Sequence, residues 1–291
     1  MRPEEERSLR AAVDPSPSHN KRGFPYLLAV AFAVTLASSL RIAQVDPRLL
    51  VDRAALHNVA RFARGAWPPK LDIEFLGFLV PPVAETIQIS VMGMLIAMLI
   101  GAPLGVLATS SLRWRGILHE WSSVRNRIAL GVLPYAITRA LLSVFRSIPE
   151  YVWAFLFVRA VGLGPFPGVL AIGVAYGGML GKVYSEVFES VNPRPLEALH
   201  AAGAGTPGVL LYGLLPEALP HLVSYTLYRW ECAIRASAIL GFVGAGGLGQ
   251  QIELSMRMFQ FDEVMTLVAV LLGLVLAVDV ISSRIRAKVL A

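Results

Sequence analysis

The chain has 291 residues, of which 55% are hydrophobic and 16% are charged, and its mean hydropathy is +0.61. Soluble domains carry about 25% charged residues, so this composition excludes a soluble globular protein, and the long apolar runs predict an all-α integral membrane protein. The net charge of +6 does not indicate a nucleic-acid partner, because Lys and Arg gather in the cytoplasmic loops of membrane proteins.

Six apolar segments predict about six transmembrane helices in one bundle, since about 20 apolar residues cross the hydrocarbon of a bilayer. Residues 1–23 are polar and mixed in charge, and we expect a disordered cytoplasmic tail. The first apolar run begins too late and is too long for a cleaved signal peptide, so we expect an uncleaved span. Residues 24–80 would hold this helix and an external loop, and residues 81–285 the core. The segments are 24–45, 84–108, 128–162, 168–187, 219–243 and 264–281.

The third segment decides the number of crossings. Pro149 interrupts it, and a proline can kink a helix without ending it, so the segment is one bent span or two. With one bent span and a cytoplasmic N-terminus, two groups of basic residues both fall inside, as the positive-inside rule favours. The groups are Arg113, Arg115, Arg125 and Arg127 in one loop, and Arg284, Arg286 and Lys288 at or near a cytoplasmic C-terminal tail of residues 286–291.

The predicted external loop, residues 46–80, does not follow this charge rule, because it contains five basic residues. Four apolar residues in its first half recur at helical spacing. They predict an amphipathic helix that lies on the outer membrane surface, ended by the WPP sequence of residues 67–69. The four residues are Leu49, Leu56, Val59 and Phe62.

Between the fourth and fifth spans, the cytoplasmic loop of residues 190–216 contains the stretch EALHAAGAGTPGVLLYGLLP. The sequence NPRP at residues 192–195 breaks the preceding helix. We expect a short helix over residues 195–204, ended by the GTPG sequence of residues 205–208. A short helix of small residues that faces the cytosol indicates a docking element.

This stretch resembles the EAA loop of ABC importer permeases, whose consensus is EAA, three residues, Gly, nine residues, Ile, one residue and Leu-Pro. Leu199 replaces the second Ala of the consensus, and Gly213 replaces the Ile. Five positions match in register: Glu197, Ala198, Gly203, Leu215 and Pro216.

Three further stretches resemble the phosphonate importer permeases, the PhnE family, and the likeness covers about residues 80–285. They are ETIQISVMGM (residues 85–94), SIPEYVWAFLFV (residues 147–158) and SYTLYRWECAIRASAILGFVGAGGLGQ (residues 224–250).

The resemblance implies a type I, MetI-like importer permease fold in the inner membrane of a bacterium. Two copies of the chain, as a homodimer, would join two cytoplasmic ATP-binding subunits and an extracytoplasmic phosphonate-binding protein. ATP and Mg would bind to the partner ATPase, so the resemblance implies neither a cofactor nor enzymatic activity in this chain. The helix that begins near Glu197 would sit in a groove on the ATPase, where the carboxylate can pair with a base or cap backbone N–H groups.

Three charged residues lie within the fifth predicted span, and each costs about 2.5–3.5 kcal/mol at the centre of a bilayer. Glu231 and Arg235 share a helix face and can pair. Arg229 would then face a central cavity and bind a dianionic phosphonate or a similar oxyanion, because a guanidinium matches such oxygens bidentately. Alternatively, all three charges pair within the protein, or with Glu150 or Asp279, and hold the bundle together.

The same alternatives apply to Arg146 and Glu150, beside the kink at Pro149, where we favour a structural role. The sequence GAGGLG at residues 244–249 matches the dinucleotide-binding pattern, but no strand precedes it. We expect it to break the fifth span at its outer end. Pro149 and four glycines are the candidate hinge residues; the glycines are Gly244, Gly246, Gly247 and Gly249.

No motif indicates chemistry within the chain itself. The sequence GGMLGK at residues 177–182 lacks the spacing and the final Ser or Thr of a phosphate-binding loop. The histidines are scattered without a metal-binding spacing, and Cys232 is the single cysteine, which excludes an intramolecular disulfide.

We therefore predict the permease subunit of an ATP-driven phosphonate importer, with a phosphite or phosphate importer as the alternative within the same class. An ion-coupled carrier or a channel that works without an ATPase is an alternative of another class, and a membrane scaffold is a third. Neither the carrier nor the channel explains the register of Glu197 to Pro216.

Overall fold

The computed structural model describes residues 23–43, 52–110 and 127–290. Most of the predicted tail and the loop arginines Arg113, Arg115 and Arg125 lie outside these residues. The chain divides into two compact units, residues 1–61 and residues 62–291. The described part of the first unit contains α2 (Gly23–Ile42) and the start of α3 (Arg53–Ala66). The apolar side chains of α2 are exposed, as a helix inside a bilayer requires.

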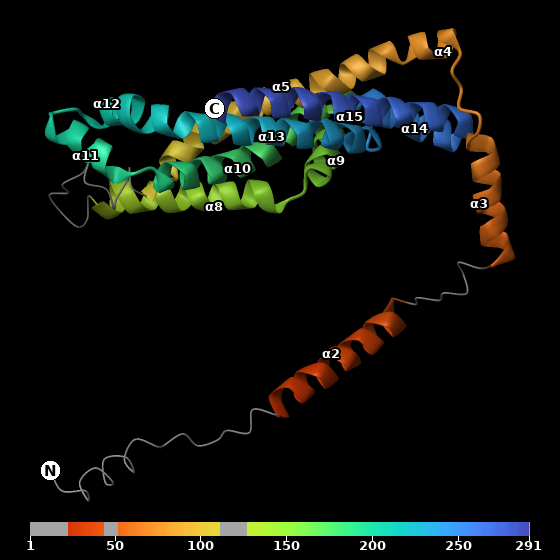
Figure 1. The fold of residues 1–291 in the computed structure, drawn as a ribbon, viewed down its shortest axis with the longest axis horizontal. Helices are drawn as coiled ribbons and strands as arrows, with labels where there is room; N and C mark the ends of the chain where they lie inside the picture. The colour runs from red at the N-terminus through yellow and green to blue at the C-terminus, as the bar shows by residue number, and fades with distance from the viewer. Residues whose placement is uncertain (1–22, 44–51, 111–126, 291) are drawn as a thin grey trace, which may run out of the picture. The chain divides into compact units, whose positions relative to one another are not determined.

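The second unit is a bundle of helices, with short helices at both of its ends (Figure 1). α11 and α12 lie at one end, and α14 lies at the opposite end. The described residues contain no strand, which agrees with the predicted all-α fold. In chain order the elements are α4 (Ile73–Phe78), α5 (Val80–Leu107), η2 (Arg127–Val132), α8 (Leu133–Ser147), α9 (Glu150–Val161), α10 (Pro165–Ser190), α11 (Pro193–Ala201), α12 (Thr206–Gly208), η3 (Val209–Leu214), α13 (Leu215–Gly241), α14 (Gly247–Arg257) and α15 (Phe261–Leu290).

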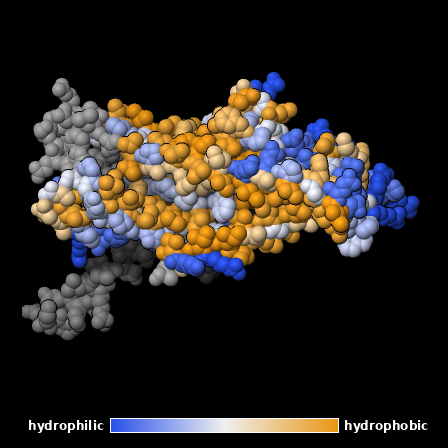
Figure 2. Space-filling view, turned by 90° about the horizontal axis from the view of Figure 1, so that it is seen from above, coloured by the Kyte–Doolittle hydropathy of each residue, from blue (hydrophilic) through white to orange (hydrophobic). Residues whose placement is uncertain are grey.

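Every predicted span falls on a helix or on a pair of helices, and the protein crosses the membrane several times. α5, with the short α4 that precedes it, α10 and α15 are long and apolar enough to cross, and the α8–α9 pair can form a fourth crossing. α13 has 27 residues but includes the charged residues of the fifth predicted span. Figure 2 shows broad apolar areas on the face that is in view, with hydrophilic side chains gathered mainly near its ends.

The third predicted segment forms two helices that meet at 88°. α8 has 15 residues and α9 has 12, which correspond to lengths of about 22 Å and 18 Å. η2 lengthens α8 at its start, but α9 alone is too short to cross about 30 Å of hydrocarbon, so the pair accounts for at most one crossing. Trp153 supports the break at Pro149, because its indole N–H donates to the carbonyl of Phe145 at 3.3 Å and its ring packs edge-on against the Phe145 ring.

Small residues bring α5 and α10 into close contact. A Cβ added at Gly93 would lie 2.7 Å from the Cβ of Ile172, and one added at Gly101 would lie 2.9 Å from the Cβ of Leu180. The two backbones can approach only because these positions lack side chains, as in many interfaces between membrane helices. The small residues are Gly93, Ala97, Gly101 and Gly105 on α5 and Gly173, Gly177 and Gly181 on α10.

Ion pairs tie the helices together near both ends of the bundle. Toward α11, Arg139 of α8 pairs with Glu189 of α10 at 2.9 Å, and Glu189 also accepts the backbone N–H of Ser110 at 2.7 Å. Toward α14, Lys70 pairs with Glu263 of α15 at 3.0 Å. The hydrogen bond to Glu263 raises the pKa of Lys70 above its usual value.

Candidate functional site

α11 carries the predicted docking segment and has two different faces. Leu196 and Leu199 are half-buried and turn toward η3, and Leu196 packs against the main hydrophobic core. Glu197 and Ala198 are exposed. Within the described part of the chain, Glu197 forms no ion pair. One face therefore anchors the helix, and the other is open to a partner.

The end of α11 is set by Gly203 and not by the later glycines. Gly203 has a φ of +90°, which favours glycine. Its N–H donates to the carbonyl of His200 at 2.9 Å, and the N–H of Ala204 donates to the carbonyl of Leu199 at 3.1 Å. These are the two bonds of a Schellman cap. The helix consequently ends at Ala201, earlier than predicted, and the consensus glycine acts as the helix cap.

The two departures from the EAA consensus lie next to each other. A Cβ added at Gly213 would lie 2.8 Å from Cδ1 of Leu199 and 2.8 Å from Cδ2 of Leu196. Leu199 is larger than the alanine of the consensus, and Gly213 is smaller than the isoleucine. The larger side chain thus occupies space that the smaller residue leaves free.

The last two matched positions begin α13. Leu215 packs against the main core, and Leu214 beside it is 1% exposed. Pro216 lies in the first turn of α13, where the missing N–H of proline costs no hydrogen bond. These residues anchor the return of the loop into the bundle, while Glu197 and Ala198 are presented at its surface.

Glu231 pairs with a residue that was not predicted as its partner. Its Oε1 lies 2.5 Å from Nη1 of Arg286 on α15, and Glu231 is 7% exposed. The expected pair with Arg235 does not form. Arg235 is exposed, and its Nη2 donates to Sγ of Cys232 at 3.4 Å. Glu231 pairs with Arg286 of the neighbouring helix because Glu231 is buried in the contact between α13 and α15.

Arg229 is held by aromatic side chains. Its Nε donates to the hydroxyl oxygen of Tyr225 at 2.8 Å. The carbon at the centre of its guanidinium lies 5.3 Å from the ring of Tyr225, and 5.9 Å from the rings of both Tyr176 and Tyr228. Within the described part of the chain, neither Arg229 nor Arg235 forms an ion pair with a carboxylate. We call these two arginines and three tyrosines the arginine–tyrosine face.

The residues beside the kink are less tightly held. Arg146 is exposed, and Glu150 is half-buried in the first turn of α9, where it interacts electrostatically with Tyr176. Neither forms an ion pair among the residues that the structure describes. Over the same residues, no three His, Cys, Asp or Glu side chains lie together as metal ligands.

Two side chains of α5 bind the glycine-rich turn after α13 through hydrogen bonds. Gly246 and Gly247 have φ values of +83° and +71°, in the left-handed region that favours glycine. The carboxylate of Glu85 accepts the N–H of Gly247 at 2.6 Å, and the hydroxyl oxygen of Thr86 accepts the N–H of Leu248 at 2.9 Å. Side chains of α5 therefore cap the first free N–H groups of α14.

Gly249 has a different requirement. A Cβ at this position would overlap the carbonyl oxygen of Ala238, a backbone atom of α13. Gly249 thus permits the close contact between α13 and α14. Among the four predicted hinge glycines, Gly244 shares the left-handed conformation of Gly246 and Gly247, with a φ of +93°.

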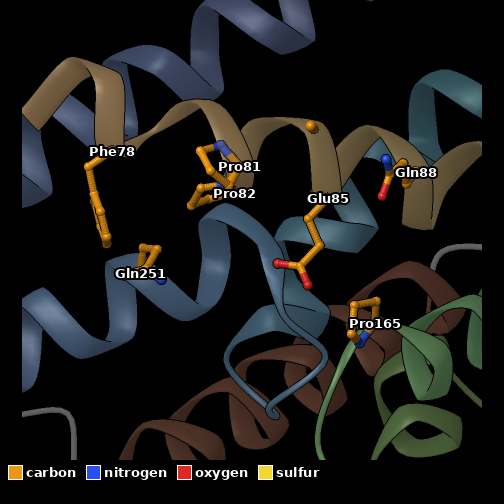
Figure 3. A pocket seen from close by; sticks show the side chains of 8 residues that line it. Phe78, Pro81, Pro82, Glu85, Gln88, Pro165 and Gln251 are labelled. Atoms are coloured by element: carbon orange, nitrogen blue, oxygen red, sulfur yellow. The ribbon is translucent and has the colours of Figure 1, made fainter.

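Glu85 also lines a pocket of about 590 Å³ at the α14 end of the bundle. Figure 3 shows its carboxylate between the start of α10 and the glycine-rich turn, with proline rings and amide side chains around it. The pocket is lined by Phe78, Pro81, Pro82, Ala84, Glu85, Gln88, Pro165 and Gln251.

The sequence alone assigns no role to Glu85 and Thr86 of the ETIQ stretch, and it does not predict the tyrosines around Arg229. Tyr225 and Tyr228 lie four residues and one residue before Arg229. The spacing of four is a signal of contact on a helix. Tyr176 belongs to another helix, so the sequence around Arg229 contains no sign of it.

Known proteins share both the sequence and the fold. Residues 127–289 match the family described as "Binding-protein-dependent transport system inner membrane component". The chain is 33% identical to the putative phosphite transport system permease protein HtxC of Stutzerimonas stutzeri, over 98% of this chain and 93% of that protein. It is also 33% identical to the phosphate-import permease protein PhnE of Mycolicibacterium smegmatis, over 76% of this chain and 38% of that protein.

Among solved structures, the fold resembles a chain of the MetNI methionine ABC transporter in an inward-facing conformation. The TM-score is 0.63 at 26% identity, and the match covers 75% of this chain and 99% of that chain. The family match covers more than half of the chain, and HtxC matches it almost from end to end. The chain therefore belongs to the family of inner-membrane components of binding-protein-dependent transport systems, and it is a PhnE-type, MetI-like permease.

Proposed function

We propose that the chain carries phosphonate, or a related phosphorus oxyanion, across the bacterial inner membrane in an ATP-driven importer. A permease of this family is a multi-pass transport subunit and not an enzyme, and ATP hydrolysis belongs to a separate subunit. The observation that carries the assignment of the cargo is the arginine–tyrosine face, where Arg229 and Arg235 have no carboxylate partner within the described residues. Guanidinium groups bind tetrahedral oxyanions bidentately.

The exposed face of α11 supports coupling to the ATPase. Glu197, which forms no ion pair within the described residues, offers its carboxylate to a basic group or to backbone N–H groups on the partner. After α11, the chain continues through α12 and η3 directly into α13. A displacement of α11 would therefore be transmitted along a short stretch of backbone to the helix that carries Arg229.

We infer that two copies of the chain form the membrane part of the importer. Arg229 lies near the middle of α13, and Arg235 is exposed on the isolated chain. A charged side chain in hydrocarbon costs about 2.5–3.5 kcal/mol, so exposure of this face to lipid is unfavourable. A second copy and a water-filled path between the copies would cover it. With six spans, both termini would lie in the cytoplasm, as the positive-inside rule predicts.

A phosphonate-binding protein would deliver the cargo at the opposite end from α11, where the glycine-rich turn lies. Phosphite is the second candidate cargo, and phosphate is a third. The near end-to-end match with HtxC, which is named for phosphite transport, favours phosphite among the alternatives. The match with the phosphate-import permease covers 38% of that protein and gives weaker support.

The test begins with tagged protein purified from its native membranes in mild detergent. An ATPase subunit and a binding protein should copurify, and the binding protein is then titrated with phosphonate, phosphite and phosphate. The complex is then reconstituted in vesicles. It should take up the ligand only when ATP is present on the side of the membrane where the ATPase lies. Uptake by the permease alone, without an ATPase, would contradict the proposal and support a carrier.

A further inference from the structure

We propose that the arginine–tyrosine face is itself a binding site for a tetrahedral phosphorus oxyanion in its dianionic form. The inference rests on the proposed function, since it names the place inside the permease where the cargo is held after the binding protein releases it. The site consists of Arg229 and Arg235 of α13 with the phenols of Tyr176, Tyr225 and Tyr228.

The first argument is that Arg229 is held in place without being neutralised. A carboxylate would fix the guanidinium but would also cancel its charge. Aromatic rings attract a cation through their electron-rich faces and add no net negative charge. Three rings surround Arg229 at 5.3 to 5.9 Å. The side chain is therefore positioned while its full positive charge is available to an anion.

The contrast with Glu231 shows that the chain pairs a buried charge where only packing is needed. On the α15 side of α13, Glu231 and Arg286 neutralise each other at 2.5 Å. On the arginine–tyrosine face, two cations lie on one helix without such a partner in the described residues. Glu231 acts on Arg235 only through space, since its carboxylate is paired with Arg286, and Glu150 interacts with Tyr176 without an ion pair to either arginine among the described residues.

The second argument comes from the hydrogen bonds. Nε of Arg229 donates to the hydroxyl oxygen of Tyr225, and this uses one of the five N–H donors of the guanidinium. The two terminal nitrogens have no acceptor among the described residues, so they form the fork that binds two oxygens of a phosphorus oxyanion. Because the Tyr225 oxygen accepts from Nε, its own proton is directed elsewhere and can be donated to the same anion.

The third argument is the position of the second cation. Arg235 lies about 9 Å further along the helix, toward the glycine-rich turn, and it is exposed. The two arginines also lie about 120° apart around the helix, so we assign them as successive and not simultaneous contacts of one small ion. Arg235 therefore receives the anion near the outer end, and Arg229 holds it deeper, among the rings. Two positive charges in sequence favour a dianion over a monoanion by electrostatics.

The experiment uses the purified full-length permease in lipid nanodiscs, without ATPase or binding protein. Binding of radiolabelled inorganic phosphate is measured by equilibrium dialysis near pH 8, with methylphosphonate and nitrate as competitors. Wild-type protein should bind phosphate, methylphosphonate should displace it, and an equal concentration of nitrate should not. Arg229→Gln should weaken binding about 10- to 100-fold, as expected for loss of a charged hydrogen-bond pair.

Three further variants separate binding from folding. Arg229→Lys keeps the charge and loses the fork, so it should also bind at least about tenfold more weakly. Tyr225→Phe should weaken binding less, by about fivefold. Arg257→Gln is the matched control, because Arg257 lies on α14 and pairs with Glu253; it should bind like wild type. Gel filtration and thermal unfolding would confirm that each variant is folded.

The proposal is overturned if wild-type permease does not bind phosphate, if nitrate competes equally, or if Arg229→Gln and Arg229→Lys both bind like wild type. Failure here is distinct from failure of the proposed function. If the complete complex takes up phosphonate with ATP but phosphate binding to the permease does not depend on Arg229, only this site is refuted. A complete complex without ATP-driven uptake would refute the function.

Discussion

The effects of changes at Leu199 and Gly213 on stability should be coupled, because the Leu199 side chain occupies space that the missing side chain of Gly213 leaves free. The single change Gly213→Ile restores the consensus residue and places its Cβ 2.8 Å from methyl groups of both Leu196 and Leu199. The single change Leu199→Ala restores the other consensus residue and leaves a space beside Gly213. The double variant restores both consensus residues together.

The magnitudes follow from the packing. Overfilling a packed site costs about 1–3 kcal/mol. Truncation of a fully buried leucine costs about 2–5 kcal/mol, and Leu199 is only half-buried, so we expect about 1–2 kcal/mol for Leu199→Ala. The isoleucine in the double variant fills the space that Leu199 vacates, and only its close contact with the Leu196 methyl group remains. We therefore expect the double variant to be more stable than the sum of the single changes by about 1–2 kcal/mol.

The assay compares thermal unfolding of the four proteins in one detergent, together with ATP-driven uptake by the reconstituted complex. Both single variants should lose thermal stability and uptake, and the double variant should regain part of both, because the contact of residue 213 with Leu196 remains close. Leu199→Ala combined with Gly273→Ala is the control, because no atom lies within 4 Å of a Cβ added at Gly273. Single effects that add to within about 0.5 kcal/mol in the Leu199–Gly213 pair would refute the reasoning.

Three other predictions concern separate contacts. Gly249→Ala should prevent accumulation of folded protein, since the added Cβ overlaps the backbone of α13, whereas Gly273→Ala should be accepted; expression and gel filtration of both variants check this. Glu231→Ala should lower stability by about 1–3 kcal/mol because it leaves the half-buried Arg286 without its partner, and Glu231→Ala with Arg286→Met should be more stable than Glu231→Ala in thermal unfolding. Glu197→Arg should leave the fold intact but abolish uptake and the copurification of the ATPase; normal uptake would remove Glu197 from the coupling contact.

The membrane fold could be predicted from the sequence because apolar length and composition alone specify a spanning helix. The described parts of five predicted segments fall on one helix each, and the third segment falls on η2, α8 and α9; three helices and the bent pair are long and apolar enough to span, and the break at Pro149 was also visible. The angle of 88° was not, because it depends on how Trp153 packs against Phe145. Proline indicates where a helix bends, and tertiary contacts decide by how much.

The residues of the candidate site were easier to predict than the residues with which they pair. Arg229 was identified from its position in a span, but the sequence offered Arg235 as the partner of Glu231 by spacing alone. The structure selects Arg286, 55 residues away, because burial against α15 outweighs a local pair on an exposed face. Similarly, Leu199 and Gly213 are two separate mismatches to the EAA consensus in the sequence, although they lie against each other in the structure.

The close contact of α5 with α10 has a consequence for how the importer changes conformation. Ile172 and Leu180 fit against Gly93 and Gly101 with almost no free space, so the two helices cannot slide along each other without steric clash. We therefore expect them to move as one rigid body during the transport cycle. A pair of spectroscopic labels on their lipid-facing sides would report a constant separation in every state, and this pair supplies the fixed reference frame against which the displacement of α13 can be measured.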